Sequence, residues 1–379
     1  MKVHITLVGG QPVPVYHGIV ATQPDKVIYI YSQQSAKALE SIKAELNLPH
    51  EVFLLTPVNP QEIKKKAEEL AEIYKNDDVT VNISSGPKSW SHLFGLTFDK
   101  YPNADVVYID QNNVLWNYSD FTHKSDFKYD MFAIFRLADN ALKHYTDFSV
   151  YTEEDDACAK EIEKIRRINF SDFNHLTAIL SSENQKQLHD CKNGEFFSGY
   201  SSVRWHKETA TEEPHVTFNI YDKYGKETEK ELSSPHIIEL TFNSGWFEYK
   251  IARILSKWNK AENIYMNCKF PSKENLDKNE VDIIVDTGTK LLFVECKTQI
   301  ADTTTIDKFS TVVKTYGGTG SKGIFITDSQ MKNLATEKCN ERKLMHFSLH
   351  YTSQNGKFAT TDINKLYELL DNELFNFNI

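Results

Sequence analysis

Cysteine is scarce in this sequence of 379 residues, and its spacing suggests no cross-link or metal site. The five cysteines are Cys158, Cys191, Cys268, Cys296 and Cys339. An odd number without a C-x-x-C pair indicates neither a disulfide framework nor a zinc site held by thiolates. We therefore expect a reduced protein of the cytoplasm.

Long apolar runs are also lacking. No stretch of the sequence approaches the roughly 20 continuous apolar residues that a membrane-spanning helix needs. The N-terminus has no basic region followed by an apolar segment and a cleavage site of small residues, the pattern of a secretory signal. Membrane-spanning and secreted proteins are therefore not the expected classes, and no membrane partner is expected.

Basic residues are too few to balance the acids. Lys and Arg number 43 against 53 Asp and Glu, which gives a net charge of -10. Such a molecule should repel nucleic acid unless a basic surface or a metal offsets the charge locally. The charge argues against a protein that coats DNA, but it leaves room for an enzyme that handles nucleic acid briefly. The length indicates two or more domains.

The pattern of residues 1–150 predicts an α/β domain with a parallel sheet. Short β-branched runs alternate there with amphipathic helical runs. A helix should begin at Pro60, with Asn59 as its cap. A hairpin turn at Asn112 and Asn113 should close the sheet. The expected strands are Val3 to Val8, Lys26 to Tyr31, Glu51 to Leu55, Val79 to Ile83 and Asp105 to Ile109.

We place the domain boundary near residue 150. A helix from about Tyr129 to Lys143 should lead to it, and the acidic segment Thr152 to Asp156, which we interpret as uncapped, should follow it. The second domain then spans residues 151–379. In its first part, residues 157–235, the pattern predicts only one or two helices and a strand. We expect this part to support or line the remainder of the second domain. The remainder is again α/β, in a different arrangement.

Acidic residues gather around one predicted hairpin in the second domain. Two apolar strands flank the turn Asp286 to Thr289. If Val285 pairs with Lys290, the alternation of side chains puts two carboxylates and one ammonium on one face of the sheet. These groups belong to Asp282, Glu295 and Lys297. The two carboxylates then lie diagonally, about 7 Å apart at Cβ, close enough to share a hard divalent cation.

A third acid can face this hairpin from a helix. Gly245 and Trp246 open an amphipathic helix, and Glu248 lies on the flank of its buried stripe. Like charges in a partly buried cluster are costly unless a cation intervenes. Ordinary solvated charges on an exposed hairpin face are the alternative. The helix acid, taken together with the spacing of the other acids and the lysine, favours an active site.

The arrangement resembles the PD-(D/E)xK nuclease superfamily, in which a helix Glu, a strand Asp and a Glu-x-Lys on the next strand form the active site. The matching, and so implied catalytic, residues are Glu248, Asp282, Glu295 and Lys297. The resemblance implies Mg2+ or Mn2+ held by Asp282, Glu295 and the carbonyl of Cys296. The metal would lower the pKa of a bound water and stabilise charge on phosphate, while Lys297 would orient or help deprotonate that water.

Small and amide-bearing residues follow the predicted strands of the first domain, where a doubly wound sheet binds ligands. Such residues offer amides to phosphates and base edges, and a helix that begins near Pro87 aims its positive end at an anion. Ordinary turn chemistry is the alternative. Neither a G-x-G-x-x-G nor a Walker lysine loop is present, so a dinucleotide coenzyme has little support. The segments are Gly9-Gly10-Gln11-Pro12, Ser32-Gln33-Gln34, Ser84-Ser85-Gly86-Pro87-Lys88 and Asp110-Gln111-Asn112.

Two of these loops resemble the ligand loops of CRISPR-associated Rossmann fold (CARF) domains. The segment Val81 to Lys88 is similar to their Asn-x-(Ser/Thr)-Gly-Gly-(Thr/Pro)-Lys signature, with Ser85 in place of the first glycine. Leu7 to Pro12 supplies the second loop. A Rossmann-like CARF half followed by a restriction-endonuclease-like PD-(D/E)xK half resembles the standalone ancillary nucleases of type III CRISPR systems.

This resemblance implies an antiviral nuclease that cleaves DNA, RNA or both when a cyclic oligoadenylate, most often cyclic tetra-adenylate, binds. It further implies a homodimer with one two-fold symmetric ligand pocket. The implied pocket residues are Gly10, Gln11, Gln33, Ser84, Ser85, Gly86 and Lys88. Two other hypotheses stay open: a constitutive restriction or repair nuclease, and a nucleotide-responsive regulatory protein without catalysis.

Overall fold

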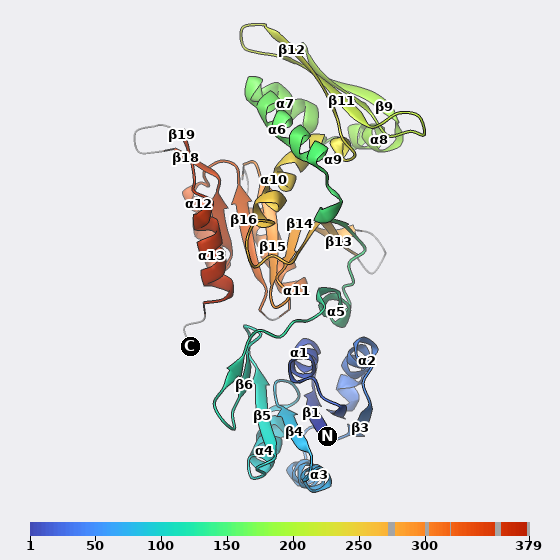
Figure 1. Cartoon of the computed structure of the whole chain (residues 1–379), viewed down its shortest axis with the longest axis vertical. Coiled ribbons are helices and arrows are strands. Elements are labelled where there is room, and N and C mark those ends of the chain that lie inside the picture. Colours follow the sequence, from blue (N-terminus) through green and yellow to red (C-terminus); the bar gives the residue numbers. More distant parts are fainter. Residues whose placement is uncertain (272–276, 300–302, 319, 353–357, 377–379) are drawn as a thin grey trace.

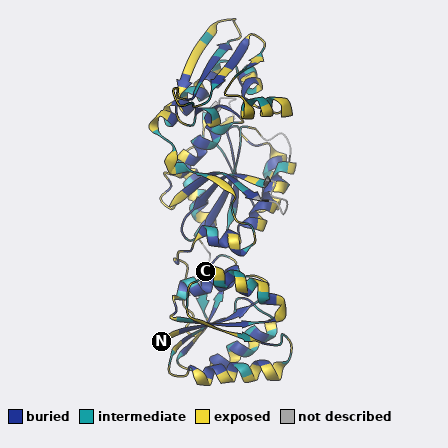
Figure 2. Cartoon of the chain, turned by 90° about the vertical axis from the view of Figure 1, so that its right-hand side faces the viewer, coloured by how far each residue is buried: buried dark blue, intermediate teal, exposed yellow. Residues whose placement is uncertain are grey.

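The computed structural model describes residues 1–271, 277–299, 303–318, 320–352 and 358–376. Its three larger sheets follow one another along the long axis of the molecule (Figure 1). Buried residues concentrate in the strands of each sheet and in the inner faces of the helices that cover them (Figure 2). None of the described helices is long and apolar enough to cross a bilayer. All five cysteines are free thiols, as their spacing predicts.

The first domain contains the predicted parallel sheet, and each predicted strand agrees with the structure to within one residue at either end. The sheet order is β3-β2-β1-β4-β5-β6-β7, so the order reverses between β1 and β4. The hairpin at Asn113, whose φ is 58°, joins β5 to β6 as predicted. The strands are β1 (Lys2–Val8), β2 (Lys26–Tyr31), β3 (His50–Leu54), β4 (Asp78–Asn82), β5 (Ala104–Ile109), β6 (Leu115–Asn117) and β7 (His123–Lys124).

Four helices of this domain cover its sheet on both faces. They are α1 (Val13–Thr22), α2 (Ala36–Glu45), α3 (Pro60–Ile73) and α4 (Lys88–Phe98). The apolar side chains of α3 and α4 pack on one face, and those of α1 and α2 pack on the other. The predicted cap is confirmed, because the Asn59 side chain accepts hydrogen bonds from the backbone amides of Gln61 and Glu62.

The helix predicted before the domain boundary is shorter in the structure. The sequence predicts that it reaches Lys143, but α5 (Met131–Leu137) ends six residues earlier, because Asp139 adopts a left-handed φ of 57°. The following residues form β8 (His144–Asp147), which pairs with a strand of another sheet, and a 3-10 turn (Phe148–Val150). The interpretation of Thr152 to Asp156 as uncapped is wrong. Thr152 caps α6 (Glu153–Ile168) in a capping box with Asp155.

The region from α6 onward forms a helix-and-sheet lobe, residues 153–241, whose apolar side chains share one core with α10 and the third sheet. Its antiparallel sheet has the order β12-β11-β10-β9. Of its four strands, the sequence predicts only the one around Phe218, whose side chain is fully buried. The other elements of the lobe are α7 (Phe170–Thr177), α8 (Ser182–Asp190), β9 (Asn193–Ser198), β10 (Ser201–His206), β11 (His215–Tyr221), β12 (Glu227–Ser233) and α9 (Ile237–Thr241).

The third large sheet carries the predicted acidic hairpin, and its order is β17-β16-β15-β14-β13-β8. Its remaining strands are β13 (Asn263–Pro271), β14 (Asp277–Asp286), β15 (Leu291–Lys297), β16 (Lys322–Thr327) and β17 (Met345–Ser348). The helices α10 (Gly245–Leu255) and α13 (Asn364–Leu374) pack on one face. The helices α11 (Thr304–Tyr316) and α12 (Asn333–Glu341) pack on the other, and a small hairpin, β18 (His350–Thr352) and β19 (Phe358–Thr360), follows β17.

The first domain and this sheet share one apolar core. The same cluster of buried residues contains side chains of α1 and α2, of α5, and of α11 with the strands beneath it. Two backbone hydrogen bonds cross the seam. The Tyr129 amide donates to the Gly288 carbonyl at 3.1 Å, and the Gly320 amide donates to the Gln111 carbonyl at 2.8 Å. The two units are therefore packed against each other and are not joined by a free linker.

Candidate active site and ligand loops

The acidic hairpin is formed by β14 and β15, in a register two residues away from the predicted one. Asp286 pairs with Leu291 and Val285 with Leu292, so the predicted pairing of Val285 with Lys290 is wrong. The turn shifts because the Asp286 carboxylate accepts the Gly288 amide at 2.7 Å and Gly288 adopts a φ of 75°. A shift of two residues leaves each side chain on its original face, because side chains alternate with a period of two.

The predicted carboxylates and lysine meet on one face of this hairpin. The register places Asp282 beyond the Ile283–Val294 pair, which makes it the neighbour directly opposite Glu295 and not the diagonal one. Lys297 Nζ lies 2.7 Å from Glu295 Oε1 and 3.5 Å from Asp282 Oδ2. The Cys296 amide donates to Asp282 Oδ2 at 2.7 Å and fixes that carboxylate. The prediction of a shared face is confirmed.

The helix α10 brings the third acid, Glu248, to the same place. Its first residue must be glycine, because a Cβ on Gly245 would lie 1.9 Å from the carbonyl oxygen of Glu239 in α9. Phe247 and Ile251 are fully buried against the hairpin and fix the rotation of the helix. Glu248 therefore faces the other acids, and their charges act on its pKa.

Burial and mutual repulsion dominate the electrostatics of this acid cluster. Burial, followed by the charge of Asp282, raises the pKa of Glu248 well above its ordinary value and that of Glu295 to about 7. Burial alone would lower the pKa of Lys297, but Asp282 and Glu295 together raise it above the usual value. One ammonium thus lies among three acids, and the cluster retains protons that exposed carboxyl groups would lose.

The raised pKa of Glu248 makes the protein's stability depend on pH. A carboxyl group whose pKa is higher in the folded state destabilises the fold once it ionises, so stability is lost as the pH rises from about 4.5 toward the folded pKa. With a chelator present to remove divalent metal, the melting temperature of Glu248→Gln at pH 8 should therefore be higher than that of the wild type by roughly 2 °C or more. At pH 5 the two proteins should melt at the same temperature. Differential scanning calorimetry measures both, and Glu231→Gln, an exposed acid of β12, is the matched control. A lower melting temperature of Glu248→Gln at pH 8 would contradict the repulsion.

The donor atoms of the cluster suit a hard divalent cation. No group of three or more His, Cys, Asp or Glu side chains is arranged as a ready metal site in the described part of the chain. Lys297 instead bridges the two sheet carboxylates. Asp282 and Glu295 still present carboxylate oxygens on one face, and a cation between them would relieve their repulsion. They are the residues that could hold Mg2+ or Mn2+. The carbonyl of Cys296 as a further ligand stays a prediction.

A cavity of about 860 Å³ opens above the acids. Glu248 and Asp282 line it from the third sheet and α10, and residues of the helix-and-sheet lobe line it from the opposite side. Lys207 and Gln185 belong to that opposite side, and Asn243, from the loop between α9 and α10, also lines the cavity. The expectation that residues 157–235 support or line the second domain is thus confirmed for the part that borders the cavity. No local pattern marks these side chains, because only the fold brings them to the acids.

The predicted ligand loops of the first domain lie where the sheet order reverses, after β1 and β4. We call residues 9–11 and 84–88 the sensor loops. They contact each other closely. The Gly9 amide donates to Ser85 Oγ at 3.1 Å, and Ser85 Oγ donates to the Gln11 carbonyl at 3.2 Å. A Cβ on Gly9 would lie 2.5 Å from the Gly86 amide nitrogen, so this contact requires glycine.

The other predicted pocket residues divide into supporting and exposed ones. The hydroxyl of Ser84 bonds the Asn82 side chain and accepts the Ile109 amide at 2.6 Å, so it ties β4 to β5. Gly10, Gln33 and Lys88 are exposed. Lys88 opens α4, whose N-terminus has no side-chain cap among the described hydrogen bonds and so leaves amides for an anion.

Comparison with known proteins relates the chain to others through structure alone. No family model and no curated protein sequence matches it. Can2 from Sulfobacillus thermosulfidooxidans, solved with cyclic tetra-adenylate, is similar with a TM-score of 0.63 at 14% identity, over 99% of this chain and 100% of that one. VC1899 from Vibrio cholerae is similar with a TM-score of 0.60 at 14% identity, over 92% and 94% of the two chains.

A third structure, of a type III CRISPR defence DNA nuclease activated by cyclic oligoadenylate, has a TM-score of 0.54 at 16% identity. The match covers 87% of this chain and 46% of that longer one. At these identities the likeness establishes the fold. The chain thus shares the α/β fold of Can2 and VC1899 over nearly its whole length, with a Rossmann-like first domain followed by a second α/β domain.

Proposed function

We propose that this protein is a metal-dependent endonuclease of the PD-(D/E)xK type that a cyclic oligoadenylate activates, as part of type III CRISPR antiviral defence. The observation that carries the proposal is the meeting of Asp282, Glu295 and Lys297 on one hairpin face. Asp282 and Glu248 also line a large cavity beside that face. The shared fold of Can2, which was solved with cyclic tetra-adenylate, supports the choice of activator.

The residues of the cluster divide the chemistry among them. Asp282, Glu295 and the Cys296 carbonyl would hold Mg2+ or Mn2+. Glu248 would bind the same metal, either directly or through a water molecule. The metal, when bound, supplies a water of lowered pKa and positive charge opposite the phosphate. Lys297 carries its ammonium 2.7 Å from Glu295 and is placed to orient the attacking water and to balance the charge on the phosphoryl group.

The cavity offers a place for the nucleic-acid strand. Lys207 and Lys269 line it from the helix-and-sheet lobe and from β13, and they supply positive charge that the net charge of -10 lacks. Tyr145 and Gln185 line the same cavity and offer a ring for stacking and an amide for base edges. DNA, RNA or both are substrates on this proposal.

The sensor loops would bind the activator in a homodimer of the cytoplasm. Two copies of these loops, related by a two-fold axis, match the symmetry of a cyclic tetra-adenylate. Gln11, Gly10 and Lys88 present exposed groups, and Gln33 follows the neighbouring strand β2. The ligand activates the enzyme to the extent that it binds the cleavage-competent arrangement of the two chains more tightly than the resting one.

A cleavage assay tests the proposal. Single-stranded DNA, RNA and supercoiled plasmid are each incubated with Mn2+, Mg2+ or chelator, with and without a panel of cyclic oligoadenylates. Cleavage that needs both a divalent metal and a cyclic oligoadenylate is expected. Cutting at full rate without any cyclic nucleotide would identify a constitutive nuclease instead. Binding of the nucleotide without divalent-metal binding or cleavage would identify a regulatory protein.

A further inference from the structure

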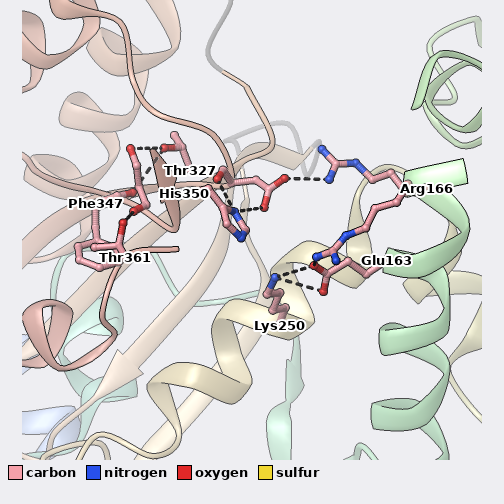
Figure 3. A network of polar contacts seen from close by, with 10 residues as sticks. Glu163, Arg166, Lys250, Thr327, Phe347, His350 and Thr361 are labelled. Atoms are coloured by element: carbon pink, nitrogen blue, oxygen red, sulfur yellow. Dashed lines mark hydrogen bonds and ion pairs between the residues drawn. The ribbon is translucent and has the colours of Figure 1, made fainter. Parts of the chain in front are cut away.

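Helix α6, which opens the helix-and-sheet lobe, contacts α10, which carries Glu248, and also Asp328, which follows the strand β16 that pairs with β15. Figure 3 shows its residues Glu163 and Arg166 near Lys250 of α10 and near His350, the first residue of β18. The side chain of Arg166 is buried, with 9% of its surface exposed. A guanidinium buried to this extent calls for a structural or chemical reason.

The first contact of Arg166 is with Asp328, which directly follows β16. Arg166 Nη1 lies 2.8 Å from Asp328 Oδ2, and the Asp328 carboxylate is also only 9% exposed. His350 Nδ1 lies 3.2 Å from the other carboxylate oxygen and 2.9 Å from the Asp328 carbonyl. The amide of Asp328 donates to the carbonyl of Lys297 at 3.1 Å. The ion pair is thus one backbone hydrogen bond away from the lysine of the acid cluster.

The second contact of Arg166 is with the start of α10. Its guanidinium carbon lies 5.1 Å from the ring centre of Trp246 and 4.6 Å from that of Phe170. Trp246 precedes Glu248 by two residues. Lys250, two residues beyond Glu248, pairs with Glu163 of α6 at 3.2 Å. Helix α6 therefore holds α10 on both sides of its acid.

We infer that Arg166 and Asp328 are a positioning pair for the proposed reaction, setting the β15 end that carries Lys297 against the α10 start that carries Glu248. The inference rests on the proposed function for the reaction itself. Stability alone is a weak reason for such a pair, because well-packed apolar residues in place of a buried ion pair are often neutral or stabilising. The pair joins three segments that are distant in the sequence and that must meet within a fraction of an ångström for catalysis.

The test compares Asp328→Asn, Arg166→Met and the double variant with the wild-type full chain. Each single variant should lower kcat about 10-fold to 100-fold and change KM less than about twofold, because the substrate still binds while the reacting groups are misplaced. The double variant leaves no unpaired buried charge, so it should melt near the wild type and yet keep a low kcat, about equal to that of the singles. Arg166→Lys, which keeps the charge, should recover part of kcat. Lys164→Ala, an exposed position of the same helix, is the matched control.

A second measurement needs no activity. Hydrogen exchange in peptides that cover residues 324–330 should become about tenfold faster in Arg166→Met, because the segment loses the group that fixes Asp328. Recovery of wild-type kcat in the double variant, or losses that multiply between the singles, would overturn the inference, as would unchanged exchange. If the wild type cleaves nothing under any condition, the proposed function fails, and unchanged exchange would still separately refute the pair.

Discussion

Glu295→Gln is expected to abolish cleavage, by about 10³-fold or more, while cyclic tetra-adenylate still binds with its wild-type affinity. The amide keeps the shape of the side chain but removes one of the two carboxylates that face each other on the hairpin. The fold should tolerate this change, because the pKa of Glu295 is raised to about 7 and the group is already partly protonated without a metal. Single-turnover rates on labelled DNA and RNA, with calorimetric titration of the activator, measure both effects.

An exposed acid of the same domain provides the control for that experiment. Glu341, at the end of α12, is exposed and distant from the hairpin in the sequence, and Glu341→Gln should cleave at the wild-type rate. Unchanged cutting by Glu295→Gln would reject the site. A simultaneous loss of activator binding would instead show that the substitution disturbs the whole chain.

Gly9→Ala should uncouple the activator from the same enzyme. The added methyl group would lie 2.5 Å from the Gly86 amide nitrogen, a backbone atom that cannot move aside alone, so the two sensor loops must separate. The separation breaks the hydrogen bonds that join Gly9 and Gln11 to Ser85. Two lost hydrogen bonds predict an activator affinity about 100-fold weaker, measured by calorimetric titration.

The neighbouring glycine offers a matched comparison. A Cβ on Gly10 meets nothing within 4 Å, so Gly10→Ala should melt like the wild type and lose less affinity than Gly9→Ala. Mn2+ affinity should be unchanged in both variants, because the substitutions lie far from the acid cluster in the fold. Wild-type activator affinity in Gly9→Ala would show that binding does not depend on the contact between the loops.

The features that could be predicted from the sequence are those set by short-range patterns of residues. The parallel strands of the first domain follow from β-branched runs, and the cap at Asn59 follows from a short-range motif. The shared face of Asp282 and Glu295 was predictable although the register was not, because a two-residue shift preserves which side each residue faces. The turn itself depends on the Asp286 side chain, which the hydrophobic pattern does not report.

Contacts between distant segments were not predictable in the same way. Arg166 and Asp328 are 162 residues apart, and neither belongs to a recognisable motif. The cavity wall around Lys207 forms only when the helix-and-sheet lobe folds over β13. The capping box at Thr152 could have been recognised in the sequence. The run of acids that follows was interpreted as an uncapped segment, although it forms the first turn of α6. Those acids suit the positive end of the helix dipole.

The seam between the first domain and the third large sheet would limit how a signal passes in the proposed nuclease. Apolar side chains of α1, α5 and α11 pack together in one buried cluster at this seam. Separating the two parts would expose these side chains to water, at a free-energy cost of about 25 cal/mol per Å² of apolar surface. A hinge inside the chain would therefore work against its own folding energy. In the proposed homodimer, we therefore expect each subunit to move as one rigid body, and the ligand-driven motion to take place at the contact between the two subunits.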